Sequence, residues 1–323
     1  MNTIEGTEAA TAGPRIARKR GFLGEMSRNG SVYLMFLPVF VLLLLFNYLP
    51  MAGIVVAFKN YQFANGLFGS EWAKPLLNNF EYLVSSEYAF RAIRNTVLLN
   101  LLFIATGLLF EIGLALLLNE IRSKYFKKVA QSITFLPYFI SWIVVGVFTY
   151  NLLTDVGVVN TIIGYFGHEP VDFYNSPGLW PAILALIMRW KVTGYGSVIY
   201  LAALAGIDSS YYEAASIDGA TRWQQMWYIS LPLLRPTVII LTLLAVGRIM
   251  NADFGMFYAV VGSAATLYST TDVVDTFVYR GLRINGDVGM SAAAGFLQST
   301  VAFVLVLGSN LIARKLDKDS ALF

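Results

Sequence analysis

The sequence predicts an all-α membrane protein with six transmembrane helices and with both termini in the cytosol. Of its 323 residues, 57% are hydrophobic and 13% are charged, and the mean hydropathy is +0.61. Globular proteins hold about half apolar and a quarter charged residues. Apolar runs of about 18 or more residues recur along the chain, and each is long enough to cross roughly 30 Å of hydrocarbon as a helix. Polar segments that alternate in Lys and Arg content separate these runs.

The first apolar run distinguishes a retained helix from a cleaved signal peptide. Residues 1–30 are polar and basic and contain no apolar run, so they are expected to form a cytosolic tail. The run that follows is too long for the core of a signal peptide, although Pro38 and Pro50 interrupt it. The expected spans cover about 31–58, 93–119, 129–153, 180–205, 236–260 and 290–313.

The positions of Lys and Arg give the expected orientation. Of the 23 basic residues, fourteen lie in the segments expected inside, six lie in or beside the segments expected outside, and three lie within spans. The outside stretch 154–179 has neither Lys nor Arg, whereas a basic cluster at 122–128 marks the cytosolic side. The simplest partition is a transmembrane domain at 31–313, with cytosolic tails at 1–30 and 314–323 and a cytosolic loop at 206–235.

Several kinds of chemistry are excluded or disfavoured. The chain has no cysteine, which removes disulfides, thiolate metal sites and a cysteine nucleophile. His168 is the only histidine and is expected to be a loop residue, because no second histidine can share a metal with it. No G-x-x-x-x-G-K-[ST] phosphate loop is present. An intramembrane enzyme is disfavoured because Glu111 and Asp253 are predicted at different depths.

The loop 206–235 is a polar island between two long apolar runs. Ser210 and Glu213 have the spacing of a capping box, which predicts the start of a short helix. Gly219 is expected to end that helix, since glycine adopts the left-handed conformation common just past a helix end. Thr221 and Gln224 predict a second capping box. We therefore expect two short helices joined by a turn along the membrane surface.

The spacing within this island is more specific than that of an ordinary amphipathic loop. Glu-Ala-Ala at 213–215 is followed after three residues by Gly219 and, nine residues later, by Ile229-x-Leu231-Pro232. This pattern resembles the EAA loop of the permease subunits of binding-protein-dependent ABC importers. Six spans with the loop between the fourth and fifth resemble the carbohydrate branch of that family, and the chain is similar to oligosaccharide and polysaccharide permeases, including those of alginate importers.

The resemblance implies a type I ABC importer permease fold and a division of labour among subunits. The EAA loop would be a coupling helix docked in a groove of the ATPase, with the joint formed by Glu213, Ala214, Ala215, Asp218, Gly219, Ile229, Leu231 and Pro232. The implied partners are a second permease subunit, two ATPase subunits and an extracytoplasmic solute-binding protein. The permease pair would be a heterodimer of homologous subunits or a homodimer. ATP and Mg would be bound by the ATPase, so this chain is expected to bind no cofactor and to be no enzyme. The implied location is the inner membrane of a bacterium, with no nucleic-acid partner.

Three cations are expected inside the spans. Arg189 and Lys191 in the fourth span and Arg248 in the fifth fall at similar depths, where a charge costs roughly 2.5–3.5 kcal/mol. These residues could pair with Glu111, Asp253 or helix carbonyls and hold the bundle together. Alternatively, they could line the path and bind an anionic cargo, because a guanidinium fork suits a carboxylate.

Aromatic residues of the fourth span add to the candidate path. Trp190 and Tyr195 could stack on sugar rings, or they could belong to the interfacial belt and to helix packing. Gly194 and Gly196 could permit close helix packing or a bend. The favoured cargo is an acidic, alginate-like oligosaccharide or polysaccharide; a neutral oligosaccharide or an ATP-independent carrier are the alternatives. The candidate path residues are Arg189, Trp190, Lys191, Tyr195 and Arg248.

Overall fold

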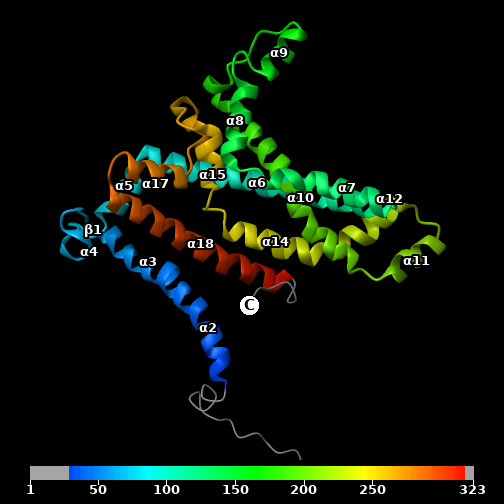
Figure 1. The fold of residues 1–323 in the computed structure, drawn as a ribbon, viewed down its shortest axis with the longest axis horizontal. Helices are drawn as coiled ribbons and strands as arrows, with labels where there is room; N and C mark the ends of the chain where they lie inside the picture. Colours follow the sequence, from blue (N-terminus) through cyan, green and yellow to red (C-terminus); the bar gives the residue numbers. More distant parts are fainter. Residues whose placement is uncertain (1–28, 317–323) are drawn as a thin grey trace, which may run out of the picture. The chain divides into compact units, whose positions relative to one another are not determined.

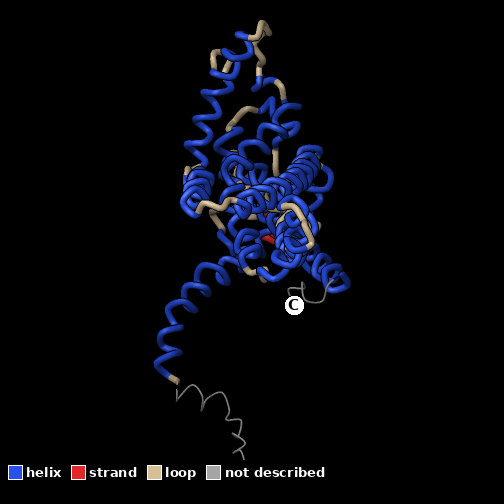
Figure 2. Tube along the Cα trace, turned by 90° about the vertical axis from the view of Figure 1, so that its right-hand side faces the viewer, coloured by secondary structure: helices blue, strands red, loops and turns tan. Residues whose placement is uncertain are grey.

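The protein is described by a computed structural model that covers residues 29–316. Nearly all regular structure is helical, as Figure 2 shows. The chain divides into two units, with the boundary between Gly53 and Ile54. In the first unit, the described residues form a helical run of α2 (Gly30–Leu43), a wide turn at Leu44–Tyr48 and α3 (Leu49–Met51). No side chain of these three segments is buried, as expected for an apolar helix in contact with lipid.

The second unit begins with a 3₁₀ segment and a small hairpin. The 3₁₀ segment Ala52–Phe58 crosses the boundary between the units. Strands β1 (Lys59–Asn60) and β2 (Glu71–Trp72) are antiparallel, with Lys59 opposite Trp72. The remaining helical segments are α4 (Gly66–Gly69), α5 (Asn78–Ser85), α6 (Glu87–Glu120), α7 (Lys124–Phe135), α8 (Trp142–Leu153), α9 (Val158–Tyr165), α10 (Trp180–Ala205), α11 (Ser209–Ile217), α12 (Arg222–Gln225), α13 (Leu231–Leu233), α14 (Arg235–Gly247), α15 (Phe254–Met256), α16 (Tyr268–Thr271), α17 (Val274–Arg283) and α18 (Val288–Leu316).

Shorter 3₁₀ and π-helical turns connect several of these helices. The 3₁₀ turns are Leu136–Phe139, Phe173–Asn175, Pro177–Leu179 and Ala265–Leu267, and the π-helical turns are Met226–Ser230 and Phe257–Val261. Helices α6 and α10 run beside each other in the middle of the second unit (Figure 1). The other helices of this unit are arranged around that pair.

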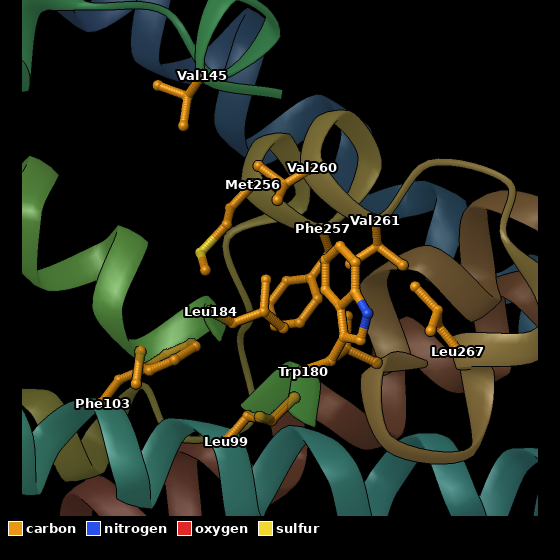
Figure 3. Close-up of a cluster of buried hydrophobic side chains, with 12 residues drawn as sticks. Leu99, Phe103, Val145, Trp180, Leu184, Met256, Phe257, Val260, Val261 and Leu267 are labelled. Carbon is orange, nitrogen blue, oxygen red and sulfur yellow. The ribbon is translucent and has the colours of Figure 1, made fainter. Parts of the chain in front are cut away.

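A hydrophobic cluster packs the middle of α6 and the start of α10 against the segments around α8 and α15. Trp180 and Leu184 at the start of α10 are fully buried against Met256 and Phe257, as Figure 3 shows. Leu99 and Phe103 of α6, Val145 of α8 and further apolar residues from 260–273 complete it. The Trp180 indole N–H is not left unpaired, because it donates to the carbonyl oxygen of Phe173 at 2.7 Å.

Four of the expected spans coincide with helical stretches long and apolar enough to cross a membrane. These are Gly30–Phe58, Glu87–Glu120, Pro177–Ala205 and Val288–Leu311. A fifth stretch, Trp142–Tyr165, also qualifies. A sixth results only if Arg222–Leu233 and Arg235–Gly247, which meet at a bend of 54°, count as one span. The number of six and the cytosolic position of both termini stay predictions.

The predicted continuous third span at 129–153 is wrong. Helix α7 ends at Phe135, a short 3₁₀ turn carries Pro137, and the backbone is extended at Ile140 and Ser141 before α8 begins. The Ser141 hydroxyl then caps α8 by accepting from the Val144 N–H at 3.4 Å. The break arises because proline lacks an N–H and disfavours helical conformation in the residue before it, and because Ser141 offers a good N-cap.

The predicted continuous fifth span at 236–260 is also wrong. Helix α14 ends at Gly247, and residues 248–253 are not helical before the short α15 begins. Polar side chains from α6, α17 and α18 satisfy the exposed backbone groups of this break, as described below. Irregular backbone at membrane depth is tolerated where it is buried in protein or lines a cavity.

The predicted partition into a domain at 31–313 and two tails stays a prediction. Most of both tails lies outside residues 29–316.

Candidate functional site

The predicted coupling loop folds as two short helical segments with a defined turn. The side chain of Asp208 caps α11 by accepting from the Ser210 backbone N–H at 2.9 Å. The predicted Ser210–Glu213 capping box is therefore wrong, because Asp208 begins the helix earlier and Glu213 accepts from the Ser209 hydroxyl at 3.1 Å instead. The N–H and hydroxyl of Ser210 hold the pKa of Asp208 below its usual value.

Gly219 ends α11 as predicted. Its φ is +81°, in the left-handed region that favours glycine. The Ala220 N–H donates to the Ala215 carbonyl at 2.9 Å, and the Gly219 N–H donates to the Ser216 carbonyl at 3.2 Å. This pair of bonds is the Schellman motif, which satisfies carbonyls that the helix end would leave free.

The second capping box is confirmed. Thr221 accepts from the Gln224 N–H at 3.3 Å, while the Gln224 side chain accepts from the Thr221 N–H at 2.7 Å. The chain then continues through Ile229 in a wide helical turn to Leu231 and Pro232 at the start of α13. Ile229 and Leu231 are half-buried, whereas Pro232 is exposed.

Four residues that the sequence reasoning missed fasten α11 to the following turn. The Tyr212 and Ser230 hydroxyls lie 2.9 Å apart, and the amide of Gln225 donates to the Ser216 hydroxyl at 2.9 Å. In the sequence these four residues look like ordinary polar surface residues. Only the fold shows that they lie next to one another. The opposite side of α11 is open, with Glu213, Ala214 and Asp218 exposed and Ala215 half-buried.

The helix α11 lies at one end of the second unit in Figure 1, away from α17 at the other end. An exposed helix with two alanines offers little side-chain bulk to an approaching protein surface. Ile217 next to them is 88% exposed, which is an apolar group without a partner among residues 29–316.

The structure separates the predicted path residues into three environments. Arg189 and Arg248 line one cavity of about 450 Å³ between α6, α10 and α14. Trp190, half exposed, lines a mostly apolar groove of about 700 Å³ between α6, α7 and α10, to which Arg189 also contributes. Lys191 and Tyr195 face the break between α7 and α8.

Lys191 closes the break between α7 and α8. Its ammonium donates to the carbonyl oxygens of Tyr138 (2.8 Å), Pro137 (3.3 Å) and Ile140, and it lies 5.1 Å from the centre of the Trp142 ring. The side chain is buried. All three ammonium protons can be used on these carbonyls. These contacts match the first of the two alternatives for Lys191, in which the cation bonds to helix carbonyls and holds the bundle together.

Two further contacts support the same region. Tyr195 stacks on Tyr138 with ring centres 4.2 Å apart. The Trp142 indole N–H donates to the Asp253 carboxylate at 2.7 Å, which connects α8 to the break in the fifth span. The aromatic residues Tyr138 and Trp142 therefore have packing roles in this conformation.

Arg189 is held by one ion pair but still reaches the cavity. Its Nη1 lies 2.9 Å from Oε1 of Glu111, and both side chains are mostly buried. Gly196 makes room for this pair, since a Cβ at that position would overlap the Glu111 carboxylate. At Gly194 a Cβ would overlap the Thr134 carbonyl, so both glycines serve close packing, and α10 runs through them without a break.

Arg248 has no such partner. Its side chain is exposed, and its guanidinium forms no hydrogen bond or ion pair within residues 29–316. It begins the break in the fifth span and lines the same cavity as Glu111 and Arg189. Two guanidiniums and one carboxylate therefore give the charged lining a net charge of one positive unit. Within the described residues, the charge of Arg248 has no counter-charge bonded to it.

Polar residues on three other helices shape the break beside Arg248. The amide of Asn100 on α6 donates to the Ile249 (2.8 Å) and Asn251 (3.3 Å) carbonyls. The Asp275 carboxylate accepts from the Ala252 N–H at 2.8 Å, and Gln298 of α18 donates to the Met250 carbonyl. The sequence reasoning missed these residues, although Asn100 and Gln298 were visible as polar residues within apolar runs.

Comparison with known proteins identifies the family. Residues 104–318 match the family model described as binding-protein-dependent transport system inner membrane component. The chain belongs to this family. The permease is 35% identical over 310 residues to Protein LplB of Bacillus subtilis (strain 168), with 96% of this chain and 95% of that protein covered.

A second relative and a solved structure are similar over nearly the whole permease. It is 35% identical over 303 residues to the polygalacturonan/rhamnogalacturonan transport system permease protein YteP of the same organism, which covers 94% of this chain and 93% of that protein. It also superimposes, at a TM-score of 0.82 and 34% identity, on a chain of a bacterial alginate ABC transporter crystallised with an alginate pentasaccharide-bound periplasmic protein. That alignment covers 92% of this chain and 98% of the other.

These findings confirm the resemblance drawn from the EAA spacing. The family is described as a transport system component and YteP is named as a permease, so this chain is a transporter component and not an enzyme, as predicted. The roles of the individual loop and path residues stay predictions.

Proposed function

We propose that this permease forms the translocation path of an ATP-driven importer for acidic oligosaccharides. The observation that carries the proposal is the cavity between α6, α10 and α14, where the unpaired guanidinium of Arg248 lies with Arg189 and Glu111. A guanidinium fork is suited to a carboxylate. The names of two relatives support the same cargo class, since polygalacturonan is a polymer of uronic acids and alginate is described as an acidic polysaccharide.

The proposed path runs along α6 and α10 past the break in the fifth span. The polar side chains of Asn100, Thr242 and Asn251 line the cavity beside the non-helical backbone at residues 248–253. Such groups can exchange hydrogen bonds with sugar hydroxyls as they pass. Broken helices beside a cavity are a recurring way to build a transport site in a membrane.

Energy would reach this path through α11. In the proposed assembly two ATPase subunits bind ATP and Mg, and the face formed by Glu213, Ala214, Ala215 and Asp218 docks on one of them. The turn at Gly219 and the bonds of Gln225 and Tyr212 to Ser216 and Ser230 make α11 a rigid lever on α12–α14. Movement of α11 would therefore be passed to the helix that leads into Arg248.

The rest of the proposed assembly follows the family. It contains a second, homologous permease subunit and an extracytoplasmic solute-binding protein that delivers the cargo. Six spans, counted with α12–α14 as one bent span, would place both termini and α11 in the cytosol of a bacterium. This orientation can be tested by introducing a cysteine at Ile217 and treating sealed cells with a membrane-impermeant thiol reagent. A cytosolic α11 should stay unlabelled.

The cargo class is tested by substituting Arg248. Arg248→Gln in the reconstituted transporter should raise the KM for trigalacturonate about tenfold or more, because a charge-assisted hydrogen bond contributes roughly 1.5–3 kcal/mol. Uptake of a neutral oligosaccharide of equal length should stay within about twofold. The matched control is Arg235→Gln, an exposed arginine at the start of α14.

Three results would contradict parts of the proposal. Equal loss on the acidic and the neutral sugar would assign Arg248 a structural role. If the unchanged permease imported only neutral sugars, the proposed cargo class would be wrong and a neutral oligosaccharide would be the cargo. Uptake that continues without ATP would favour an ATP-independent carrier.

A further inference from the structure

A second charged cavity lies apart from the proposed path. It has a volume of about 320 Å³ and is formed by α5, α6, α16, α17 and the start of α18. In Figure 1, α5 and α17 lie at the end of the second unit opposite to α11. The predicted topology assigns this end to the outside of the membrane. The residues that matter here are Tyr82, Tyr88, Arg91, Tyr268, Asp272 and Arg280.

A buried aspartate organises two arginines in this cavity. The Asp272 side chain is fully buried, and its Oδ1 lies 2.6 Å from Nη2 of Arg280 while its Oδ2 lies 3.4 Å from Nη2 of Arg91. The Thr276 hydroxyl also donates to Oδ1 at 3.2 Å. Two guanidiniums against one carboxylate leave one net positive charge among the lining residues.

The two arginines keep most of their hydrogen-bonding capacity. A guanidinium has five N–H donors in a fixed fork, and each of these arginines uses a single nitrogen on Asp272. Neither guanidinium makes another hydrogen bond to residues 29–316. The Nε of Arg91 is buried and has no acceptor among those residues. A buried donor without an acceptor is unfavourable, so this geometry favours a ligand that brings an acceptor.

Tyrosine rings fix the planes of both guanidiniums. Arg280 lies over the Tyr268 ring at 4.3 Å, and Arg91 lies over the Tyr88 ring at 5.1 Å. Tyr82 and Tyr88 are 49% and 61% exposed, so they offer ring faces and hydroxyls at the mouth of the cavity. A pre-oriented guanidinium loses little freedom when it binds a planar anion. Rings beside charged forks suit a ligand that combines a carboxylate with an apolar sugar face.

We propose that this cavity binds a carboxylate-bearing sugar unit, a hexuronate, on the outer side of the permease before the cargo enters the path. The inference rests on the proposed import of acidic oligosaccharides and adds a separate site to it. The volume lies at the lower end of small-molecule sites, roughly 300–1,000 Å³, so one sugar unit is the expected occupant. The remaining donors of Arg91 and Arg280 would hold its carboxylate, and Tyr82 or Tyr88 would pack on its ring.

The test uses the complete transporter in nanodiscs, with trigalacturonate and its carboxyl-reduced, neutral counterpart as probes. Direct binding to the transporter is measured without the solute-binding protein, and uptake is measured with it. Arg280→Gln should weaken binding of trigalacturonate and raise its KM by about tenfold or more. The kcat for trigalacturonate should change by less than about twofold. The binding and the KM of the neutral probe should also change by less than about twofold.

Matched variants separate binding from folding. Arg94→Gln is the control, because Arg94 is one turn from Arg91, donates to the Ser269 carbonyl at 3.1 Å and does not line the cavity. Its trigalacturonate KM should stay unchanged. Arg280→Gln could fail to fold, because it removes one partner of the buried Asp272 carboxylate. In that case the double variant Asp272→Asn with Arg280→Gln replaces it, because it removes both charges. Tyr88→Ala alters an exposed ring and should also weaken trigalacturonate binding.

The outcomes are distinguishable. Equal effects on the acidic and the neutral probe, or no effect, would overturn the inference and leave a structural clamp. A second result would also overturn the inference. The unchanged transporter would bind no trigalacturonate directly, and Arg280→Gln would lower the stimulation of the ATPase by the solute-binding protein with either cargo. The arginines would then contact an acidic residue of that protein. Failure of the unchanged transporter to import any oligosaccharide would instead refute the proposed function.

Discussion

The ion pair between Arg189 and Glu111 allows the most direct test of the fold around the path. The two side chains are 8% and 19% exposed and 2.9 Å apart. Glu111→Gln would leave the Arg189 guanidinium without a counter-charge, and its Nε already has no acceptor among residues 29–316. Breaking a buried pair by removing one partner costs about 3–5 kcal/mol, because an uncompensated buried charge remains.

The same helix offers a matched control. Glu120 of α6 pairs with Arg222 at 3.5 Å, but those side chains are 30% and 62% exposed. Exposed pairs contribute about 0–1 kcal/mol, so Glu120→Gln should hardly change stability. Both variants make the same chemical change on α6, and they differ in burial.

The assay is thermal unfolding of the purified permease in one detergent. With an unfolding entropy of about 2.1 cal/mol/K per residue, a chain of 323 residues shifts by roughly 1.5 °C per kcal/mol. Glu111→Gln should therefore lower the midpoint by about 4–7 °C and Glu120→Gln by about 1.5 °C or less. Arg189→Met combined with Glu111→Gln should recover part of the loss, since no buried charge then remains. Equal shifts for Glu111→Gln and Glu120→Gln would refute the reasoning.

Two further predictions concern the turn after α11 and the break in the fifth span. Gly219→Val should lower ATP-driven uptake several-fold, because a left-handed conformation costs a β-branched residue more than about 1–2 kcal/mol. The control is Gly113→Ala, since a Cβ at Gly113 would meet no other atom within 4 Å. Uptake by Gly219→Val at the wild-type rate would contradict the coupling role. Burial raises the pKa of Asp275 above its usual 3.8, so the native state binds the proton more tightly and this group's contribution to stability falls as pH rises from about 4 through the raised pKa. Asp275→Asn should remove that fall in melting curves recorded across this range, and an unchanged pH profile would contradict it.

Local patterns carried most of what could be predicted before the fold was known. The turn at Gly219 and the Thr221–Gln224 capping box depend on contacts within a few residues, and both were predicted correctly. The same local reasoning misplaced the first cap, because Asp208 and Ser210 are both good N-cap residues and spacing alone could not choose between them.

Breaks inside apolar runs were harder to predict. Hydropathy measures whether a segment prefers lipid, and the segments 129–153 and 236–260 are apolar throughout most of their length. Whether their backbone stays helical depends on partners that satisfy the free carbonyls and N–H groups. Those partners are Lys191 on α10 for the first break and Asn100, Asp275 and Gln298 for the second.

The sequence by itself determined the class of protein, the family and the segment that resembles its coupling loop, because composition and contiguous spacing contain that information. Only the tertiary structure decided the roles open to the cations within the apolar runs. Arg189 and Glu111 are 78 residues apart, and Arg91 and Asp272 are 181 residues apart. A charge is balanced by what lies within a few ångströms of it, so only the packing of distant helices could show that Lys191 is fully bonded and that Arg248 is free within the described part of the chain.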